Sequence, residues 1–313
     1  MTASLRISLP ALAGVQLAAV VAACTSGPMS PGTAARPLFV ANNGSVTVYA
    51  AGDTGNAAPL ITITGSNTRL YSPFTVARDT AGRLYVAPRL SDSITVYAPG
   101  ATGNAAPIAT IAGSSTSLAS PRAIAVDALG RLYVANQGDT ITIYAPGAVG
   151  NATPVARIGG SKTGLSGAAG LAFDAAGRLY VANGGDSSVT VYAPGAMGNI
   201  APTATIAGSN TGPIPGGVAV DGAGRLYVDN GWAVTVYAAG ASGNVAPTAA
   251  IALSYAATGI AVDGNGQLYV AEGVHGHGNR IAVYAPGASG SVPPLFVIAG
   301  VNTGLFDPTA VTF

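Results

Sequence analysis

Charged side chains are scarce in this chain of 313 residues, since Lys, Arg, Asp and Glu together make up 8% of it. The net charge is +1 and the basic residues form no stripe, which excludes the electrostatic footprint that nucleic-acid binding requires. Hydrophobic residues make up 49%, which excludes a disordered chain. The single cysteine, Cys24, excludes an intramolecular disulfide.

The usual signatures of catalysis are also missing from the sequence. It contains no G-x-S-x-G nucleophile motif and no Gly-Lys pair of the kind found in phosphate-binding loops. Only two histidines are present, and both lie in one short segment. These absences favour a binding protein over an enzyme.

What the chain has instead is a repeat. A leucine followed by an aromatic residue and valine recurs every 42 to 48 residues, at Leu38, Leu84, Leu132, Leu179, Leu226 and Leu268. A period of this length indicates a stacked architecture. The 44 glycines and 21 prolines are too dense for long helices.

Each repeat predicts four short strands, as residues 123–127, 132–136, 141–144 and 155–158 illustrate. The first two strands are joined by a tight turn such as 127–130, where an Asp opens the turn and a Gly closes it. The strands show no polar alternation, so we expect both faces of each sheet to be buried. The small residues of the first strand suit a position near a crowded central axis.

The two ends of the repeat region predict a closed ring. It opens with a strand of the second type, residues 38–42, and the chain stops at 309–313, which matches the first type. The C-terminal strand can therefore complete the N-terminal sheet and leave no open edge around the ring. We predict an all-β fold, a six-bladed β-propeller of four-stranded blades spanning 38–313.

Residues 217–228 read G-V-A-V-D-G-A-G-R-L-Y-V, which resembles the repeat of the NHL-type propellers. The resemblance extends over 38–313 and implies the same fold, which serves binding scaffolds, lyases and sugar lactonases alike. Propellers similar to gluconolactonase hold a divalent metal near the axis with acidic and Asn ligands. Equivalent positions here hold Asn136, Asn183, Asn230 and Glu272, although repetition alone would also place them so.

The N-terminus predicts export. Arg6 precedes an apolar stretch over 11–23, which is the pattern of a signal peptide at 1–23. Residues 21–24, V-A-A-C, resemble the bacterial lipobox, and the resemblance implies that Cys24 is lipidated and becomes the new N-terminus. Residues 24–37 then form a flexible tether. Position 25 is Thr rather than Asp, which by resemblance to Gram-negative lipoproteins implies the outer membrane.

Candidate ligand-binding residues lie where the repeats differ most. These are the connections between second and third strands, which share one face of a propeller with the connections between blades. The candidates there are Arg89, Asp139, Asp186, Asp229, Trp232 and Glu272. The only tryptophan, Trp232, is either a lid over the neighbouring blade or a platform for a ligand.

The segment from Glu272 to His277 is the candidate metal site. Two imidazoles, from His275 and His277, and the carboxylate of Glu272 suit zinc or copper, and a bound metal would polarise a carbonyl or activate water. The alternative is a polar surface insertion. On the opposite face, the recurring Asp and Arg of the tight turns are expected to serve their own turns as surface pairs.

Two functions follow from these observations. In the first, a lipid-anchored propeller binds an envelope protein or polysaccharide through its variable loops, without a cofactor. In the second, a metal-assisted hydrolase or lyase uses Glu272, His275 and His277.

Overall fold

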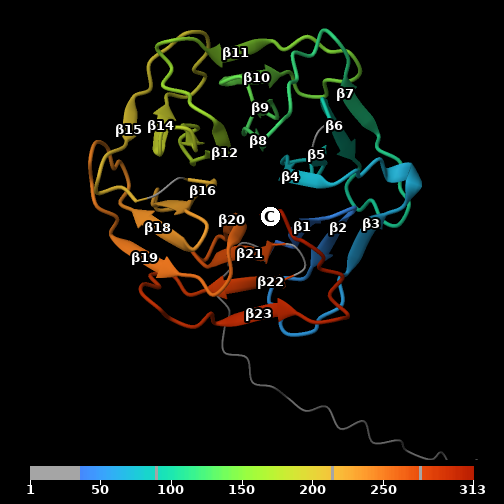
Figure 1. Ribbon diagram of the computed structural model, residues 1–313. Coiled ribbons are helices and arrows are strands. Elements are labelled where there is room, and N and C mark those ends of the chain that lie inside the picture. Colours follow the sequence, from blue (N-terminus) through green and yellow to red (C-terminus); the bar gives the residue numbers. More distant parts are fainter. Residues whose placement is uncertain (1–35, 89–90, 213–214, 275–276) are drawn as a thin grey trace, which may run out of the picture. The chain divides into compact units, whose positions relative to one another are not determined.

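The computed structural model describes residues 36–88, 91–212, 215–274 and 277–313. Residues 35–313 form one compact unit, a ring of six four-stranded antiparallel sheets arranged around a central axis (Figure 1). The predicted six-bladed propeller is confirmed. No helix among the described residues is long and apolar enough to span a membrane.

The first three blades contain the strands of the N-terminal half. Blade one consists of β24 (Ala310–Thr312), β1 (Leu38–Asn42), β2 (Ser45–Tyr49) and β3 (Ile61–Thr64), and a 3-10 turn, η1 (Ser66–Thr68), follows it. Blade two consists of β4 (Pro73–Arg78), β5 (Leu84–Pro88), β6 (Ser93–Tyr97) and β7 (Ala109–Ala112). Blade three consists of β8 (Ala123–Val126), β9 (Leu132–Asn136), β10 (Thr140–Tyr144) and β11 (Ala156–Gly159).

The other three blades follow in chain order. Blade four consists of β12 (Ala168–Phe173), β13 (Leu179–Asn183), β14 (Ser188–Tyr192) and β15 (Ala204–Ile206). Blade five consists of β16 (Gly217–Val220), β17 (Leu226–Asp229), β18 (Ala233–Tyr237) and β19 (Ala249–Ala252). Blade six consists of β20 (Ala257–Val262), β21 (Leu268–Val274), β22 (His277–Tyr284) and β23 (Phe296–Ala299).

The C-terminal strand closes the ring, as the sequence predicts. β24 pairs antiparallel with β1, with Val311 opposite Val40. Val311 is buried, and the ring of Phe313 packs edge-on against Tyr269 of blade six at 4.9 Å between centroids. Blade one therefore contains both ends of the repeat region.

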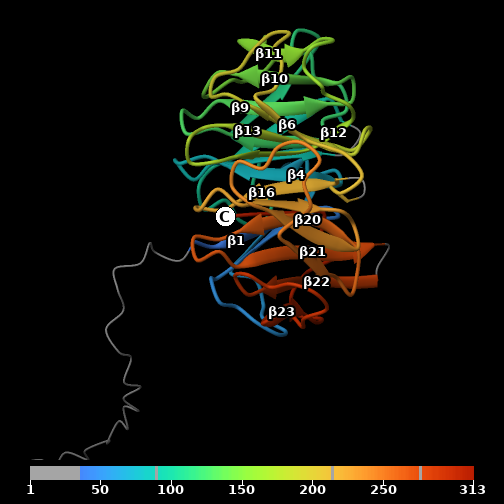
Figure 2. The ribbon, with the colours of Figure 1, turned by 90° about the vertical axis from the view of Figure 1, so that its left-hand side faces the viewer.

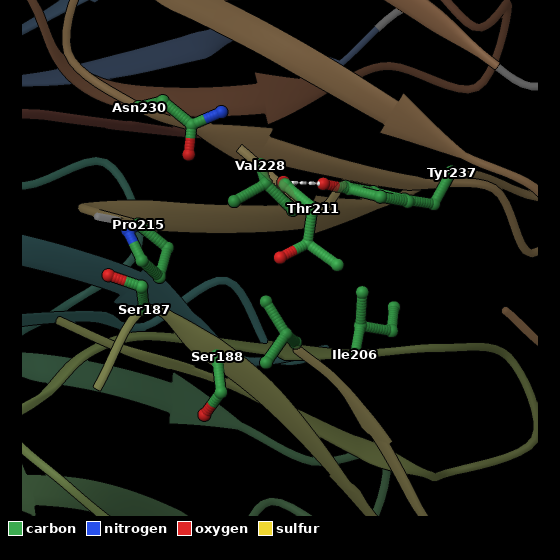
Figure 3. Close-up of a pocket in the computed structure, with 9 residues that line it drawn as sticks. Ser187, Ser188, Ile206, Thr211, Pro215, Val228, Asn230 and Tyr237 are labelled. Atoms are coloured by element: carbon green, nitrogen blue, oxygen red, sulfur yellow. Dashed lines mark hydrogen bonds between the residues drawn. The ribbon is translucent and has the colours of Figure 1, made fainter. Parts of the chain in front are cut away.

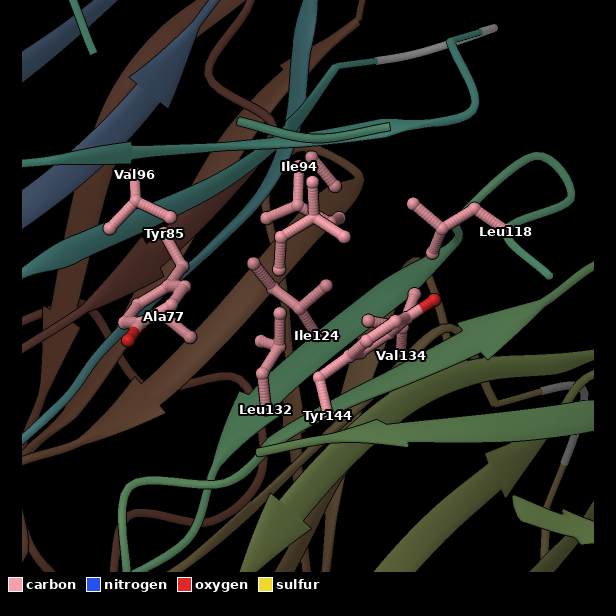
Figure 4. Packing of buried hydrophobic residues seen from close by; sticks show 11 residues of the cluster. Ala77, Tyr85, Ile94, Val96, Leu118, Ile124, Leu132, Val134 and Tyr144 are labelled. Carbon is pink, nitrogen blue, oxygen red and sulfur yellow. The ribbon is translucent and has the colours of Figure 1, made fainter. Parts of the chain in front are cut away.

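The hydrophobic core consists of six clusters, one between each pair of neighbouring blades. Figure 4 shows the cluster between blades two and three, where Ile94 and Val96 face Ile124, Leu132 and Tyr144. Every residue of β5, β9, β13 and β14 is buried. Both faces of each blade are covered, which explains why the strands lack polar alternation.

Small residues let the innermost strands approach closely. A Cβ atom on Gly170 of β12 would lie 2.8 Å from the Cα of Gly217 in β16, and one on Gly259 of β20 would lie 2.8 Å from the Cα of Ala310 in β24. Larger side chains at these positions would force the blades apart. The small residues predicted to lie near the axis are required by this packing.

A second ring of contacts joins the blades at their outer strands. Each outer strand forms a parallel bridge with a glycine in the connection between the third and fourth strands of the next blade, as Ile111 does with Gly150. The bridge between Gly55 and Ile298 closes this ring between blades one and six. The asparagine after each of five such glycines caps the preceding blade, and Asn151 accepts the amide of Ser115 in this way.

We expect Gly113→Ala to destabilise the protein, because Gly113 has φ +129° and a Cβ there would lie 2.5 Å from Oδ1 of Asn151. The backbone strain alone costs about 1–3 kcal/mol, and the clash adds to it. Gly100→Ala is the matched control, since Gly100 also has positive φ but no atom within 4 Å of the added Cβ. The free energy of unfolding in urea measures both. Equal losses would show that Asn151 does not constrain position 113.

The tight turns form the face opposite the variable loops, which we call the turn face. In four of them an Asp accepts both the amide and the side-chain Nε of an Arg four residues later, as Asp127 does from Arg131 at 2.8 and 2.7 Å. The other three pairs are Asp79–Arg83, Asp174–Arg178 and Asp221–Arg225. Each Asp serves its own turn, as expected, but the predicted surface pairs are wrong, because the Asp side chains are only 2–8% exposed and the Arg side chains 27–38%.

Candidate functional site

The candidate residues lie on the face formed by the connections between second and third strands and by those between successive blades, which we call the loop face. The antiparallel order of every blade brings these two kinds of connection to the same side, opposite the turn face (Figure 2). The positions at which one blade differs from the others, described below, lie on the loop face.

The recurring asparagines at the ends of the second strands are occupied by the scaffold. Asn136 is buried, accepts the amide of Ala119 through Oδ1 and donates through Nδ2 to Oγ1 of Thr142. Asn183 makes the same contacts with Ser166 and Thr190. These side chains clamp an inter-blade connection to the third strand, and that use competes with the metal-ligand role that the lactonase resemblance implies.

Two predicted ligand-binding carboxylates, Asp139 and Asp186, are exposed and hold local structure. Oδ1 of Asp139 accepts the amide of Gly167 at 2.6 Å, and Oδ1 of Asp186 accepts the hydroxyl of Ser188 at 2.7 Å. They belong to blades three and four. Arg89 lies outside the described residues.

The interface between blades five and six departs most from the repeat. The connection from β19 to β20 has four residues, 253–256, whereas 65–72 and 160–167 each supply eight. Leu253 stands where the other five interfaces have a glycine of positive φ, and Ser291 stands where the next blade otherwise has the capping asparagine.

Asp229 is a buried carboxylate in this interface, although it was predicted as a residue of an exposed loop. It is the last residue of β17, only 3% exposed, and occupies the position of a fully buried alanine in the other five blades. Its Oδ1 accepts the amide of Gly231 at 2.7 Å. Burial raises the pKa of Asp229 to about 6, and this hydrogen bond opposes the increase.

Glu272 comes from the opposite side of the same interface. Side chains alternate between the two faces along β21, so the side chain of Glu272 faces blade five, as those of Leu268 and Val270 do. The sequence interpretation placed Glu272 in a loop, but it lies inside β21, is fully buried, and forms an ion pair with Nε of Arg280 at 2.5 Å. Burial raises the pKa of Glu272, while Arg280 and Tyr284 lower it.

The predicted metal ligands are only partly described. His275 lies outside the described residues, and of His277 only the backbone at the start of β22 is described. One oxygen of Glu272 is held by Arg280, and the other has no hydrogen-bond partner among the described residues. The described residues hold no cluster of three His, Cys, Asp or Glu side chains suited to a metal.

Backbone hydrogen bonds join Asp229 and Glu272 to two exposed aromatic residues. Leu253 donates its amide to the carbonyl of Trp232 at 3.0 Å, which places Trp232 beside the connection that carries Tyr255. Gly231, which binds Asp229, accepts the amide of Ala257, and Ala257 lies opposite Glu272 in the β20–β21 pair. The interface therefore has two buried carboxylates beneath an aromatic surface.

Arg280 links the buried and exposed parts of this arrangement. Its guanidinium lies 4.7 Å from the centroid of the Tyr255 ring, a cation–π contact that holds the ring in place. Among the described residues, Oε1 of Glu272 and Nη2 of Arg280 have no hydrogen-bond partner. The ion pair thus keeps one free acceptor and one free donor.

A narrow cleft lies between blades four and five, lined by Ser187, Pro215, Asn230 and Tyr237 among others (Figure 3). Its volume of about 10 Å³ is on the order of one water molecule. The hydroxyl of Tyr237 donates to the carbonyl of Thr211 at its side. This cleft is too small for an organic substrate.

Sequence reasoning missed three exposed aromatic residues of the loop face. Tyr71 is 71% exposed, Phe306 54% and Tyr255 41%, beside Trp232 at 66%. Aligning the repeats could have found two of them. Tyr71 and Phe306 align with Ala119 and Ser166, which lie in the connections that precede blades three and four. Arg280 gave no such signal, because its pairing with Glu272 depends on the length of the hairpin.

No family model and no curated protein matches the chain. Among solved structures, the chain is similar to a protein of unknown function from Bacteroides caccae, with 13% identity, TM-score 0.61, and 88% and 98% of the two chains covered. It is similar to a chain of a nidogen/laminin complex at 14% identity, TM-score 0.62, with 88% and 97% covered. It is also similar to the WD40 propeller domain of Doa1, with 12% identity, TM-score 0.52, and 80% and 75% of the two chains covered. These likenesses establish the propeller fold.

Proposed function

We propose that this protein is a binding module whose ligand docks on the loop face of blades five, six and one. The observation that carries the proposal is the distribution of exposed apolar side chains. On the turn face many of them recur at equivalent positions of the repeat, as Leu60, Ile108, Val155 and Leu295 do, whereas Leu129 is an isolated exposed residue of one tight turn. On the loop face the exposed aromatic residues are confined to blades five, six and one and their connections, where the fold does not require them.

The test is co-sedimentation of residues 35–313, the compact unit, with the isolated cell envelope. We expect Tyr71→Ala/Trp232→Ala/Phe306→Ala to abolish binding, because aromatic anchors dominate interface energies. The matched control is Leu60→Ala/Leu129→Ala/Leu295→Ala. These leucines are 64%, 70% and 56% exposed on the turn face, against 71%, 66% and 54% for the three aromatic residues. Equal loss in both variants would place the binding surface elsewhere.

We also propose that the repeat is of the NHL type and that Cys24 carries a lipid anchor in the bacterial envelope. Support comes from the sequence alone, through the lipobox-like residues 21–24 and the stretch 217–228. Two acyl chains on one residue suffice for stable membrane attachment. The anchor would hold the propeller at the membrane by a tether of about a dozen residues.

We expect Cys24→Ser to abolish incorporation of labelled palmitate into the full-length protein in growing cells. The thiol is the acylation site, and serine cannot replace it as the acceptor in this modification. Equal labelling of both forms would rule out lipidation at Cys24.

The alternative, a metal-assisted hydrolase or lyase, requires Glu272 to bind a metal together with the two histidines, through the oxygen that Arg280 does not hold. A divalent metal that raises the unfolding temperature of residues 35–313, but not of His275→Ala/His277→Ala, would favour it. The aromatic departures described above would then need a separate explanation.

A further inference from the structure

We infer that the loop face of blades five, six and one binds a neutral polysaccharide. The inference rests on the proposed binding function and names the class of ligand. It is drawn from the residues that lie beside the aromatic rings, because a protein partner, a polyanion and a glycan each require different residues at those positions.

The first group of residues lies between blades one and two. Phe306 accepts the amide of Asn43 on its carbonyl at 2.9 Å, and Oδ1 of Asn43 accepts the hydroxyl of Ser72, the neighbour of Tyr71, at 3.2 Å. Asn43 and Ser72 are both exposed. Two exposed aromatic residues therefore flank an uncharged amide and hydroxyl pair.

The second group lies between blades five and six. Trp232 and Tyr255 are joined through the amide of Leu253, with the exposed hydroxyl residue Ser254 between them. Under Tyr255, the fully buried Glu272 and its partner Arg280 keep an acceptor and a donor without partners among the described residues. Both atoms are buried, so a water molecule, which donates and accepts, satisfies them, and the exposed Ser254 is the residue that a sugar hydroxyl can reach.

The two groups share one chemistry. A sugar ring has an apolar face of C–H groups, which stacks on an aromatic ring, and an edge of hydroxyls, which needs neutral or charge-assisted hydrogen bonds. Tyr and Trp supply that combination at a low cost in conformational entropy. Two separate groups on one face suit a ligand that repeats its own unit, which is a polymer.

Charge argues against the other classes of ligand. The charged neighbours of the first group, Arg69 and Asp307, have opposite signs. In the second group, Arg280 is neutralised by Glu272. No excess of positive charge is present there to hold a polyanion. Polar residues separate the rings within each group, whereas the centre of a protein interface is a packed apolar patch.

The experiment is affinity electrophoresis of residues 35–313 in gels that contain a β-1,4-glucan, a β-1,3-glucan, a mannan, a xylan or N-acetylglucosamine oligomers. We expect at least one to retard the protein, and Trp232→Ala and Tyr71→Ala each to weaken binding roughly tenfold, as the loss of an aromatic anchor does. Leu129→Ala on the turn face should migrate like the wild type.

A second arm separates this inference from the proposed function. Envelope fractions are stripped with proteinase K or with a glycosidase mixture before co-sedimentation. Binding that survives the protease and is lost after the glycosidases supports a polysaccharide. Binding lost after the protease overturns it while leaving a protein-binding module. Absence of binding to the intact envelope, together with no retardation in any gel, overturns both.

Discussion

Removal of residues 309–313 is expected to lower the unfolding temperature by on the order of 10 °C or more. The deletion eliminates β24, exposes the edge of β1 and removes the buried side chain of Val311. Loss of one buried valine costs about 1.5–3 kcal/mol. The hydrogen bonds of Thr309 to the carbonyls of Ala41 and Pro73, and the packing of Phe313 on Tyr269, are lost as well.

The matched control places the same strand at the other end of the chain. Residues 309–313, followed by the turn D-A-A-G-R of blade four, are fused directly before Leu38, which gives blade one the connection found in blade four. We expect this chain to recover most of the lost stability in a thermal unfolding experiment. A truncated chain as stable as the intact one would mean that β24 does not close the ring.

Asp229→Ala is expected to stabilise the protein at pH 8, by up to about 3 kcal/mol, since a pKa shift of about two units corresponds to that free energy. The folded state holds the Asp229 proton more tightly than the unfolded state does. The stability that the folded state gains by holding this proton is therefore fully present below pH 3.8 and is lost as the pH rises through about 6. Alanine, the residue of the other five blades, has no such dependence.

Urea unfolding between pH 4 and pH 8 measures this effect. The free energy of unfolding of Asp229→Ala should exceed that of the wild type by an amount that grows across that range. The lost hydrogen bond to Gly231 reduces this difference by about 1 kcal/mol. Asp186→Ala is the control for the removal of an exposed carboxylate of the loop face. Parallel profiles for Asp229→Ala and the wild type would show that Asp229 is not destabilised by burial.

A carboxylate kept at a cost in stability, in one blade of six, fits a position retained for binding rather than for folding. The same variant should therefore be tested in the envelope assay. A more stable Asp229→Ala protein with weaker binding would extend the site to the interface beneath Trp232. Unchanged binding would confine it to the exposed aromatic residues.

Much of the fold could be predicted because repetition multiplies each local signal sixfold. The strand over 132–136 matches β9 residue for residue, and the fourth strand, predicted over 155–158, is observed one residue later in β11. Closure followed from the strand types at the two ends. The Asp and Arg of the turn face were correctly predicted to serve their own turns, because each pair is local in sequence, but the burial of the Asp was not predicted.

The candidate site was harder to predict, because it depends on contacts between blades. Asp229 was taken for a loop residue, although strict alignment puts it on the buried alanine of the repeat. Glu272 was assigned to a loop because nothing in the sequence gives the length of the β21–β22 hairpin or its pairing with Arg280. The contact of Arg280 with Tyr255 joins β22 to the connection between blades five and six, and no local pattern encodes it.

The central claim is that the loop face of blades five, six and one is where this protein binds its ligand. Photo-crosslinking in cells tests it directly, with p-benzoylphenylalanine placed at Trp232 on the loop face or at Leu129 on the turn face, two positions of nearly equal exposure at 66% and 70%. We predict slower-migrating adducts from position 232 and none from position 129. Adducts from position 129 alone, or from both positions equally, would contradict the claim.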